Sequence, residues 1–337
     1  MTFALRKVFF TSTVLFLVIL LKMPLQNTSI KVTEFVIGGF EATKRPMVVG
    51  VVILITYVLT ILASAVNILF IIFDRNLHKP MYLLICNLAV VDIVYTSSAS
   101  PTMIGVLFAG VKTISYVPCL IQMFVFHWGG VMEMFALAVM AFDRLIAVGY
   151  PFQYHSYLTN VRTLVLTCVL WFAACCFVAV MPATVLPLPH CHTKLKYMFC
   201  EYAALVRTSC VDPTYYFNLV TIIAFFLLFF TFSLICLSYF WMIVSVKLSS
   251  NNDKKKMGST CLSHFIVVTS YYCPLFITIV LTRLGVVLTL DARQGLTLGA
   301  MLGPSLLNPL VYCLRTKEIR CKLFKVFKKI LHLSRFL

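Results

Sequence analysis

The sequence predicts an all-α membrane protein, folded as a seven-transmembrane helix bundle with an amphipathic helix 8 in the C-terminal tail. Of the 337 residues, 61% are hydrophobic and 12% are charged, whereas a soluble domain averages about 45–50% apolar and about 25% charged residues. Several apolar runs exceed the roughly 18 residues that suggest a membrane-spanning helix. Strand-like alternation is absent, which argues against an outer-membrane barrel.

Residues 1–46 form an N-terminal segment ahead of the first certain span. Arg6 and Lys7 precede the apolar run 8–21, which is too short to span a membrane comfortably and is typical of a signal-peptide core or an uncleaved anchor. No small-x-small cleavage site stands out, so both alternatives stay open. Asn27 begins an Asn-Thr-Ser tripeptide, an N-glycosylation acceptor if it faces the lumen.

The transmembrane domain is expected over residues 47–314. A loop of more than twenty residues, with three cysteines, separates the fourth and fifth spans, and the hydrophilic run 249–256 separates the fifth and sixth. In the tail, residues 315–337, apolar residues share one face among lysines and arginines, which is typical of a helix lying on the inner leaflet. The spans are predicted at 47–73, 80–107, 118–148, 163–186, 214–246, 258–284 and 293–314.

The net charge of +17 would suggest a nucleic-acid partner in a soluble protein, but here the basic residues cluster at helix ends and in the tail. We therefore exclude nucleic acid. Counted after residue 30, 16 lysines and arginines lie on the side of the tail and nine on the other side. The excess predicts a cytoplasmic C-terminus and an extracellular N-terminus. The clustered cysteines then face the compartment where disulfides persist.

Residues 140–151 read MAFDRLIAVGYP and close the third span with an adjacent acid and base, Asp143 and Arg144. Burying a charge near the middle of the bilayer costs roughly 2.5–3.5 kcal/mol, and less toward the interface. The spacing alone favours an ordinary interfacial ion pair. The motifs around it point to a functional role.

Taken in order, these motifs resemble a rhodopsin-like G-protein-coupled receptor, and within that group an odorant receptor. Residues 80–82 read PMY and residues 88–93 read LAVVDI; residues 140–151 are similar to MAYDRYVAICxP, residues 256–264 to KAxSTCxSH, and residues 307–312 read LNPLVY. The likeness covers about residues 27–335. Phe142, Leu145 and Gly149 depart from the family pattern, as does the run Tyr271-Tyr272-Cys273-Pro274, which suggests a divergent branch of fish type.

The resemblance implies a switch at the cytoplasmic end. Asp143 would hold Arg144 at rest, and on activation Arg144 would contact helix 5 and the G protein. Pro309 breaks helix 7 because it removes a donor and clashes with the preceding turn. The resemblance also assigns Tyr239, Asn308 and Tyr312 to this switch; Tyr239 directly follows Ser238. In the active state, Tyr239 and Tyr312 would contact Arg144 through water.

Two further features are implied by the resemblance. It pairs Cys119 with Cys200 and Cys191 with Cys210, a choice that spacing cannot make because four cysteines allow three pairings. Asp92 and Glu133 are carboxylates inside adjacent spans, where unpaired charge is expensive. Either one is protonated, or both share a cation such as Na⁺ with Asn67, Asn308 and waters, and we favour the ion. No other cofactor is expected.

The ligand pocket is expected between the outer halves of helices 3, 5 and 6. Its lining would be mostly apolar, with one imidazole and a small gap at glycine, which suits a small hydrophobic molecule with one hydrogen-bonding group. Tyr272 is also a candidate for a ligand-responsive switch, and aromatic packing is its ordinary role. The candidates are Phe126, His127, Gly130, Val131, Val220, Ile223, Ala224, Tyr272, Leu275, Phe276 and Ile279.

The sequence therefore predicts a multi-pass plasma-membrane receptor for a small-molecule odorant. It would activate a stimulatory G-protein α subunit with its βγ partner, raising cAMP in olfactory sensory neurons. The alternative within receptors is a non-olfactory member with a lipid or peptide ligand. A transporter would need inverted repeats or charges lining a path, and an enzyme would need a catalytic spacing such as HExxH or GxSxG. The sequence shows none of these.

Overall fold

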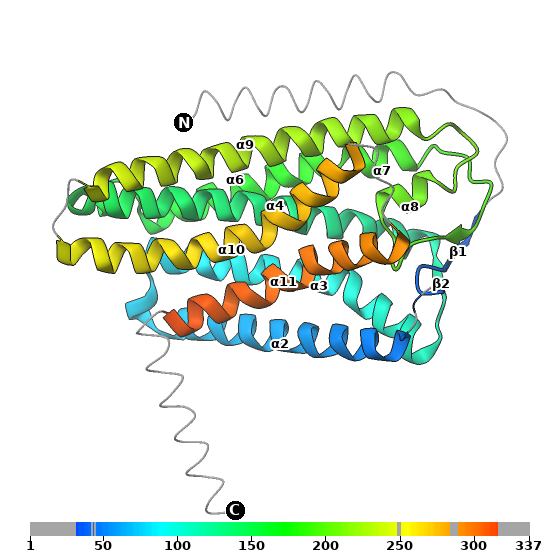
Figure 1. The fold of residues 1–337 in the computed structure, drawn as a ribbon, viewed down its shortest axis with the longest axis horizontal. Helices are drawn as coiled ribbons and strands as arrows, with labels where there is room; N and C mark the ends of the chain where they lie inside the picture. The colour runs from blue at the N-terminus through cyan, green and yellow to red at the C-terminus, as the bar shows by residue number, and fades with distance from the viewer. Residues whose placement is uncertain (1–31, 42, 44, 248–250, 284–288, 316–337) are drawn as a thin grey trace, which may run out of the picture.

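The computed structural model describes residues 32–41, 43, 45–247, 251–283 and 289–315. Within these ranges, seven long helical segments run side by side along the long axis of the molecule, as Figure 1 shows. This arrangement confirms the predicted seven-helix bundle. The segments are α2 (Pro46–Phe73), α3 (Pro80–Ala109), α4 (Tyr116–Gly149), α6 (Asn160–Val178) continued by α7 (Val180–Val185), α9 (Thr214–Lys247), α10 (Asn251–Arg283) and α11 (Leu290–Arg315).

Length and hydropathy fit a membrane environment. Among the described residues, α2, α3, α6 with α7, and α9 are each long and apolar enough to cross a bilayer, and α10 and α11 contain the shorter apolar segments His264–Thr278 and Gly295–Val311. In α3, 56% of the apolar window is buried, against 22% in α2, in α6 with α7, and in α9. The helix α3 is therefore central, whereas the other three turn most of their apolar surface outward, as lipid contact requires.

Local sequence explains several helix ends. Pro46 and Pro80 open α2 and α3, where a missing backbone N–H costs nothing and the fixed φ suits a helix. Gly110 closes α3 in the left-handed conformation, with φ of 66°, which a residue without a Cβ adopts freely. The Thr159 hydroxyl accepts a hydrogen bond from the Arg162 N–H at 3.2 Å and caps α6.

The structure differs from the predicted boundaries at two places. The hydrophilic run 249–256 was predicted as a loop, but α10 already begins at Asn251. Polarity alone does not prevent a helix, and lysine is a good helix former. The predicted fourth span, 163–186, is divided into α6 and α7. Pro182 lies in α7 and has no N–H to offer to the preceding turn, which explains an interruption there.

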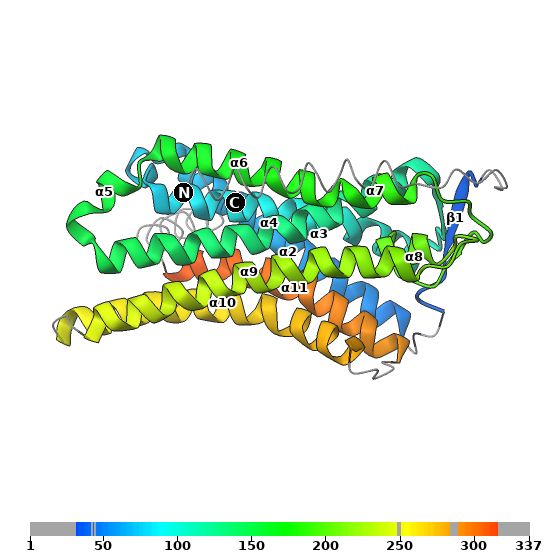
Figure 2. The same ribbon diagram turned by 90° about the horizontal axis from the view of Figure 1, so that it is seen from above.

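A small sheet that was not predicted closes one end of the bundle. Strand β1 (Glu34–Ile37) pairs antiparallel with β2 (Thr113–Ser115) and parallel with β3 (Lys194–Leu195). Figure 2 shows β1 and α8 (Tyr202–Val206) at this end and α5 (Tyr154–Tyr157) at the other. Two short helices complete the description: η1 (Arg75–Leu77) and η2 (Pro151–Gln153).

The two ends of the bundle carry different chemistry. Disulfides join Cys119 to Cys200 and Cys191 to Cys210, as the family resemblance implied. Because α4 starts beside Cys119 and ends beyond Arg144, these residues mark opposite ends. We call them the disulfide end and the Arg144 end. A disulfide typically contributes about 2–4 kcal/mol by restricting the unfolded chain.

Some predictions concern residues that the structure does not describe. The apolar run 8–21, the acceptor Asn27 and the amphipathic helix predicted over 316–333 of the tail all lie outside the described residues. The backbones of Ile279 and Tyr312 belong to α10 and α11, but their side chains are outside the described part.

Candidate functional site

A cavity of about 240 Å³ lies inside the bundle toward the disulfide end. Its lining contains eight of the eleven residues predicted to contact a ligand. Helix α4 contributes four of them, α9 contributes three and α10 contributes one, so the three predicted helices do meet around one space. The eight are Phe126, His127, Gly130, Val131, Val220, Ile223, Ala224 and Leu275.

The rotation of α10 differs from the prediction by one residue. Tyr271 lines the cavity, whereas Tyr272 and Phe276 are absent from its described lining. The Tyr271 hydroxyl donates to the Gly130 carbonyl at 2.7 Å, and the Tyr272 hydroxyl donates to Thr231 Oγ1 at 2.7 Å. Consecutive helical residues point about 100° apart, so only one of two neighbouring tyrosines can face α4. Tyr272 instead ties α10 to α9.

The cavity also has walls that were not predicted. Glu201, beside Cys200, borders it at the disulfide end. Apolar residues that face a cavity carry no local signal that separates them from residues facing lipid, so the sequence did not reveal them. The unpredicted lining comes from α3, α4, α6, α7, α9, α10 and α11 and includes Tyr95, Met134, Phe177, Val178, Met181, Leu227, Thr278, Leu296, Thr297 and Ala300.

His127 supplies a defined polar group in this apolar lining. Its Nδ1 lies 2.8 Å from the Met123 carbonyl oxygen. A carbonyl only accepts hydrogen bonds, so in this contact Nδ1 carries the proton. In a neutral ring Nε2 is then an acceptor. The cavity therefore suits an apolar molecule that carries one hydroxyl or amine donor.

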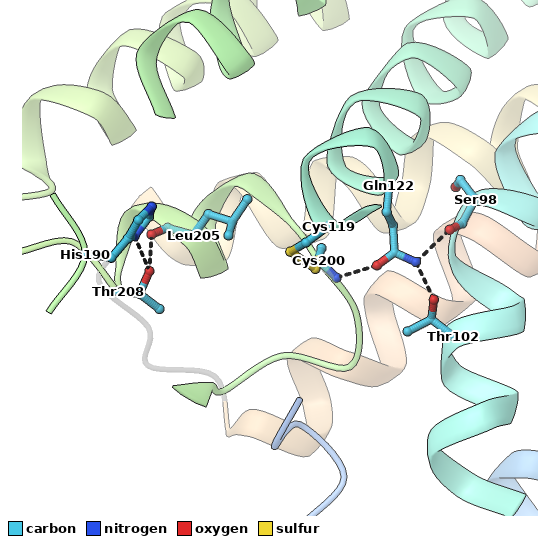
Figure 3. The surroundings of a disulfide bond; sticks show 8 residues. All are labelled: Ser98, Thr102, Cys119, Gln122, His190, Cys200, Leu205 and Thr208. Carbon is cyan, nitrogen blue, oxygen red and sulfur yellow. Dashed lines mark hydrogen bonds between the residues drawn. A yellow bond between two sulfur atoms is a disulfide. The ribbon is translucent and has the colours of Figure 1, made fainter. Parts of the chain in front are cut away.

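Gln122 fastens the loop above this cavity to two helices, as Figure 3 shows. The Cys200 N–H donates to Gln122 Oε1 at 2.9 Å, beside the disulfide to Cys119. Gln122 Nε2 in turn donates to the Ser98 carbonyl at 2.8 Å and to Thr102 Oγ1 at 2.7 Å. One buried amide thus joins α3, α4 and the loop.

The predicted polar core residues are brought together in the middle of the bundle. Asn308 Nδ2 donates to Asp92 Oδ1 at 2.8 Å and to Glu133 Oε1 at 3.2 Å. Asn67 lies one contact away, since its Nδ2 donates to the Pro309 carbonyl at 3.1 Å. Both carboxyl groups are fully buried. Three helices therefore share one asparagine, at the point where proline interrupts α11.

At the Arg144 end, the predicted pair is present but loose. Arg144 Nε lies 4.0 Å from Asp143 Oδ2, while Arg144 Nη1 donates to the Met81 sulfur at 3.0 Å. Asp143 has a closer partner, because the Tyr154 hydroxyl donates to its Oδ1 at 2.6 Å. Burial, followed by the Asp143 carboxylate, raises the pKa of Tyr154, so this hydroxyl keeps its proton. Tyr154 was not predicted.

Tyr239 binds α10 in this structure. Its hydroxyl lies 2.7 Å from His264 Nδ1, and His264 is buried. The approach of Tyr239 to Arg144 was predicted for the active state, and it stays a prediction. The contact between Tyr239 and His264 joins α9 and α10 at the Arg144 end.

This arrangement is that of a seven-helix membrane receptor: a bundle with a cavity near one end, a disulfide-bonded loop above it, and a polar core leading to a partly buried arginine at the other end. Comparisons with known proteins identify the family. Residues 53–330 match the family model described as olfactory receptor. The chain therefore belongs to the olfactory receptor family, and it is a G-protein-coupled receptor and not an enzyme.

Curated relatives agree with this assignment along nearly the whole chain. Olfactory receptor 13G1 of Homo sapiens is 32% identical over 306 residues, covering 89% of this chain and 98% of the relative. Olfactory receptor 2AT4 of Homo sapiens is 31% identical over 283 residues, covering 82% and 87%. Olfactory receptor-like protein OLF4 of Canis lupus familiaris is 32% identical over 317 residues, covering 91% and 99%.

Proposed function

We propose that this receptor binds a small odorant in the cavity of about 240 Å³ and activates a stimulatory heterotrimeric G protein, raising cAMP in olfactory sensory neurons. The observation that carries the proposal is the cavity, apolar except for a few polar groups, between α4, α9 and α10. Ligand sites in proteins commonly measure about 300–1,000 Å³. A space at or below the lower limit supports a small molecule over the alternative peptide or lipid ligand.

The proposed orientation places the disulfide end outside the cell and the Arg144 end in the cytoplasm of a plasma-membrane receptor. The excess of lysine and arginine on the side of the Arg144 end supports it. The disulfides at the opposite end support it independently, because an oxidising compartment preserves them. The assignment to a fish-type branch stays a prediction from the motif departures.

A ligand must first be found with a cAMP reporter in cells that display the intact receptor. Amino acids, bile acids, amines and volatile odorants cover the relevant chemistry. Molecules with an apolar body and one donor group are expected among the activators, because His127 Nε2 is an acceptor in the neutral ring.

Filling the cavity is expected to weaken the response to that ligand. Ala224 lines the cavity, and Ala224→Phe would occupy the space that the ligand needs. The half-maximal concentration should rise at least about tenfold, equivalent to about 1.4 kcal/mol of lost binding. The matched control is Ile222→Phe, because Ile222 lies two residues away and is 67% exposed. Unchanged responses from a surface-expressed Ala224→Phe receptor would place the ligand elsewhere.

We also propose that the polar core holds Na⁺ between Asp92 and Glu133. Within the part of the chain that the structure describes, Asp92 Oδ2, Glu133 Oε2 and Asn308 Oδ1 are buried oxygens that lack a hydrogen-bond partner. Hard cations prefer such oxygen ligands, so the residues fit the ion. The ion would supply one positive charge and so offset one of the two negative charges that the buried carboxyl groups can carry.

Basal cAMP is the measurement that tests the ion. It should depend on pH and on whether NaCl or choline chloride is present at equal ionic strength, and the sodium dependence should be lost in Glu133→Gln. Glu34→Gln, at an exposed acid of β1, serves as the control and should keep it. Equal basal activity of the native receptor in both salts argues for shared protons in place of Na⁺.

A further inference from the structure

A second cavity, of about 530 Å³, lies in the loop region at the disulfide end. It shares no described lining residue with the ligand cavity, and α8 lies between the two cavities. Glu201, just before α8, borders the inner cavity, whereas Ala204 and Arg207 border the outer one. We call this second space the loop cavity.

The loop cavity is lined by basic side chains. Eight of the residues that the structure describes line it; four of these are His192, Lys194, Lys196 and Arg207, and none of the eight is an acid. Among the described residues, Lys194 is the one of these cations that pairs with an acid, since its Nζ lies 2.8 Å from Glu41 Oε2. Lys196 and Arg207 therefore leave at least two positive charges facing the same concave space, which concentrates anions there.

The acid beside the rim is committed to a structural role. Asp212 precedes the lining residue Pro213, and its Oδ1 accepts hydrogen bonds from the Thr214 N–H at 3.0 Å and the Thr214 hydroxyl at 2.7 Å. These hydrogen bonds cap the first turn of α9 and lower the pKa of Asp212, so its carboxylate is ionised and bonded to the helix.

Arg207 is positioned by stacking. Its guanidinium carbon lies 5.1 Å from the centre of the Phe217 ring. Stacking uses the face of the guanidinium plane, while the N–H donors lie along its edge. An arginine held in this way is suited to two parallel hydrogen bonds with a phosphate or a carboxylate.

The frame of the loop cavity is rigid. The disulfide between Cys191 and Cys210 closes it, and the Cys191 N–H donates to the Thr208 carbonyl at 2.9 Å. Figure 3 shows the hydrogen bond between His190 and the hydroxyl of Thr208. His190 Nδ1 lies 2.9 Å from this hydroxyl, and Thr208 is itself a lining residue. Burial lowers the pKa of His190, so this histidine is neutral and its role is to hold the loop through the hydrogen bond to Thr208. A preformed site loses little conformational entropy when a ligand binds.

We propose that the loop cavity binds a small soluble dianion, either a phosphate monoester or a dicarboxylate. Two negative charges match the two cations that Glu41 does not neutralise, and a molecule of this class fits the volume. A soluble molecule is favoured over a lipid headgroup because the lining belongs to the loop between α7 and α9 and to the residue preceding α9, beyond the apolar surface of the helices.

The test is isothermal titration of the purified full-length receptor in nanodiscs of phosphatidylcholine alone. Inorganic phosphate, adenosine monophosphate and succinate are titrated, each against chloride at equal ionic strength. One of the dianions should bind saturably with one-to-one stoichiometry. The double variant Lys196→Gln with Arg207→Gln should weaken that binding at least about tenfold.

The matched control removes two charges at the same end but outside the loop cavity: Arg45→Gln with Lys112→Gln. It should change the affinity less than about twofold, because separated surface charges are screened by salt. Thermal unfolding without anion shows that each variant is folded, and in the native receptor the bound dianion should raise the unfolding midpoint.

Three results would overturn the proposal. These are no saturable binding of any of the three anions, equal weakening by both double variants, and loss of binding when phosphatidylserine replaces part of the phosphatidylcholine, which would assign the cavity to lipid headgroups. None of these readouts uses an odorant or a G protein, so failure here is distinguishable from failure of the proposed function.

Discussion

Replacing Arg144 with alanine is expected to abolish ligand-driven cAMP while leaving the receptor at the cell surface. Arg144 makes a 4.0 Å approach to Asp143 and a bond to a thioether, Met81, which is a weak acceptor. The Asp143 carboxylate keeps its bond from Tyr154 without the arginine. Stability should therefore change little, whereas the cation that the G protein is proposed to meet is lost.

The control for this variant is Arg162→Ala at the same end of the bundle. Arg162 is exposed and donates to the carbonyls of Ser156 and Tyr157. Surface display is measured with an extracellular epitope tag and signalling with the cAMP reporter. Normal ligand-driven cAMP from Arg144→Ala would remove Arg144 from the switch, and so would an equal loss in Arg162→Ala.

Gly129→Val is expected to prevent the receptor from reaching the surface in folded form. A Cβ built on Gly129 would lie 2.9 Å from both Cα and Cβ of Tyr95, so α3 and α4 are in contact at this point without room for a side chain. Overpacking a core typically costs about 1–3 kcal/mol. Valine adds three carbons against backbone that cannot rotate away, and total stability is only about 5–15 kcal/mol.

The matched control is Gly105→Val in α3, where a Cβ would meet no described atom within 4 Å. This variant should be displayed like the native receptor, because valine costs less than glycine in a helix. Surface display and the thermal unfolding midpoint of purified protein are the measurements. A Gly129→Val receptor that unfolds at the native temperature would show that α3 and α4 are further apart than described.

Most of the fold could be predicted because lipid imposes a length and a composition on each span. The apolar runs predicted α2 and α9 to within one residue at each end. The polar start of α10 was missed because polarity outside the bilayer does not distinguish helix from loop. The three-stranded sheet was missed because its strands are two to four residues long and pair across distant parts of the chain.

The candidate site could be predicted where it contains polar residues, because burying a polar side chain without a partner costs free energy. Asp92, Glu133 and Asn308 stand out as polar residues in apolar runs, and the structure brings them together. Apolar residues offer no such contrast. Tyr272 was predicted to line the cavity, whereas Tyr271 does so. An error of one residue rotates a helical side chain by about 100°. The bond from Tyr154 to Asp143 depends on the path of a loop, which local sequence does not specify.

The most direct test of the account is nucleotide exchange by a purified stimulatory G protein, mixed with the receptor in nanodiscs and with an activator found in the screen. We expect faster exchange with the native receptor, the same maximum at a higher ligand concentration with Ala224→Phe, and no acceleration with Arg144→Ala. Acceleration by Arg144→Ala equal to that of the native receptor would contradict the account, as would an activator that binds the cavity without accelerating exchange.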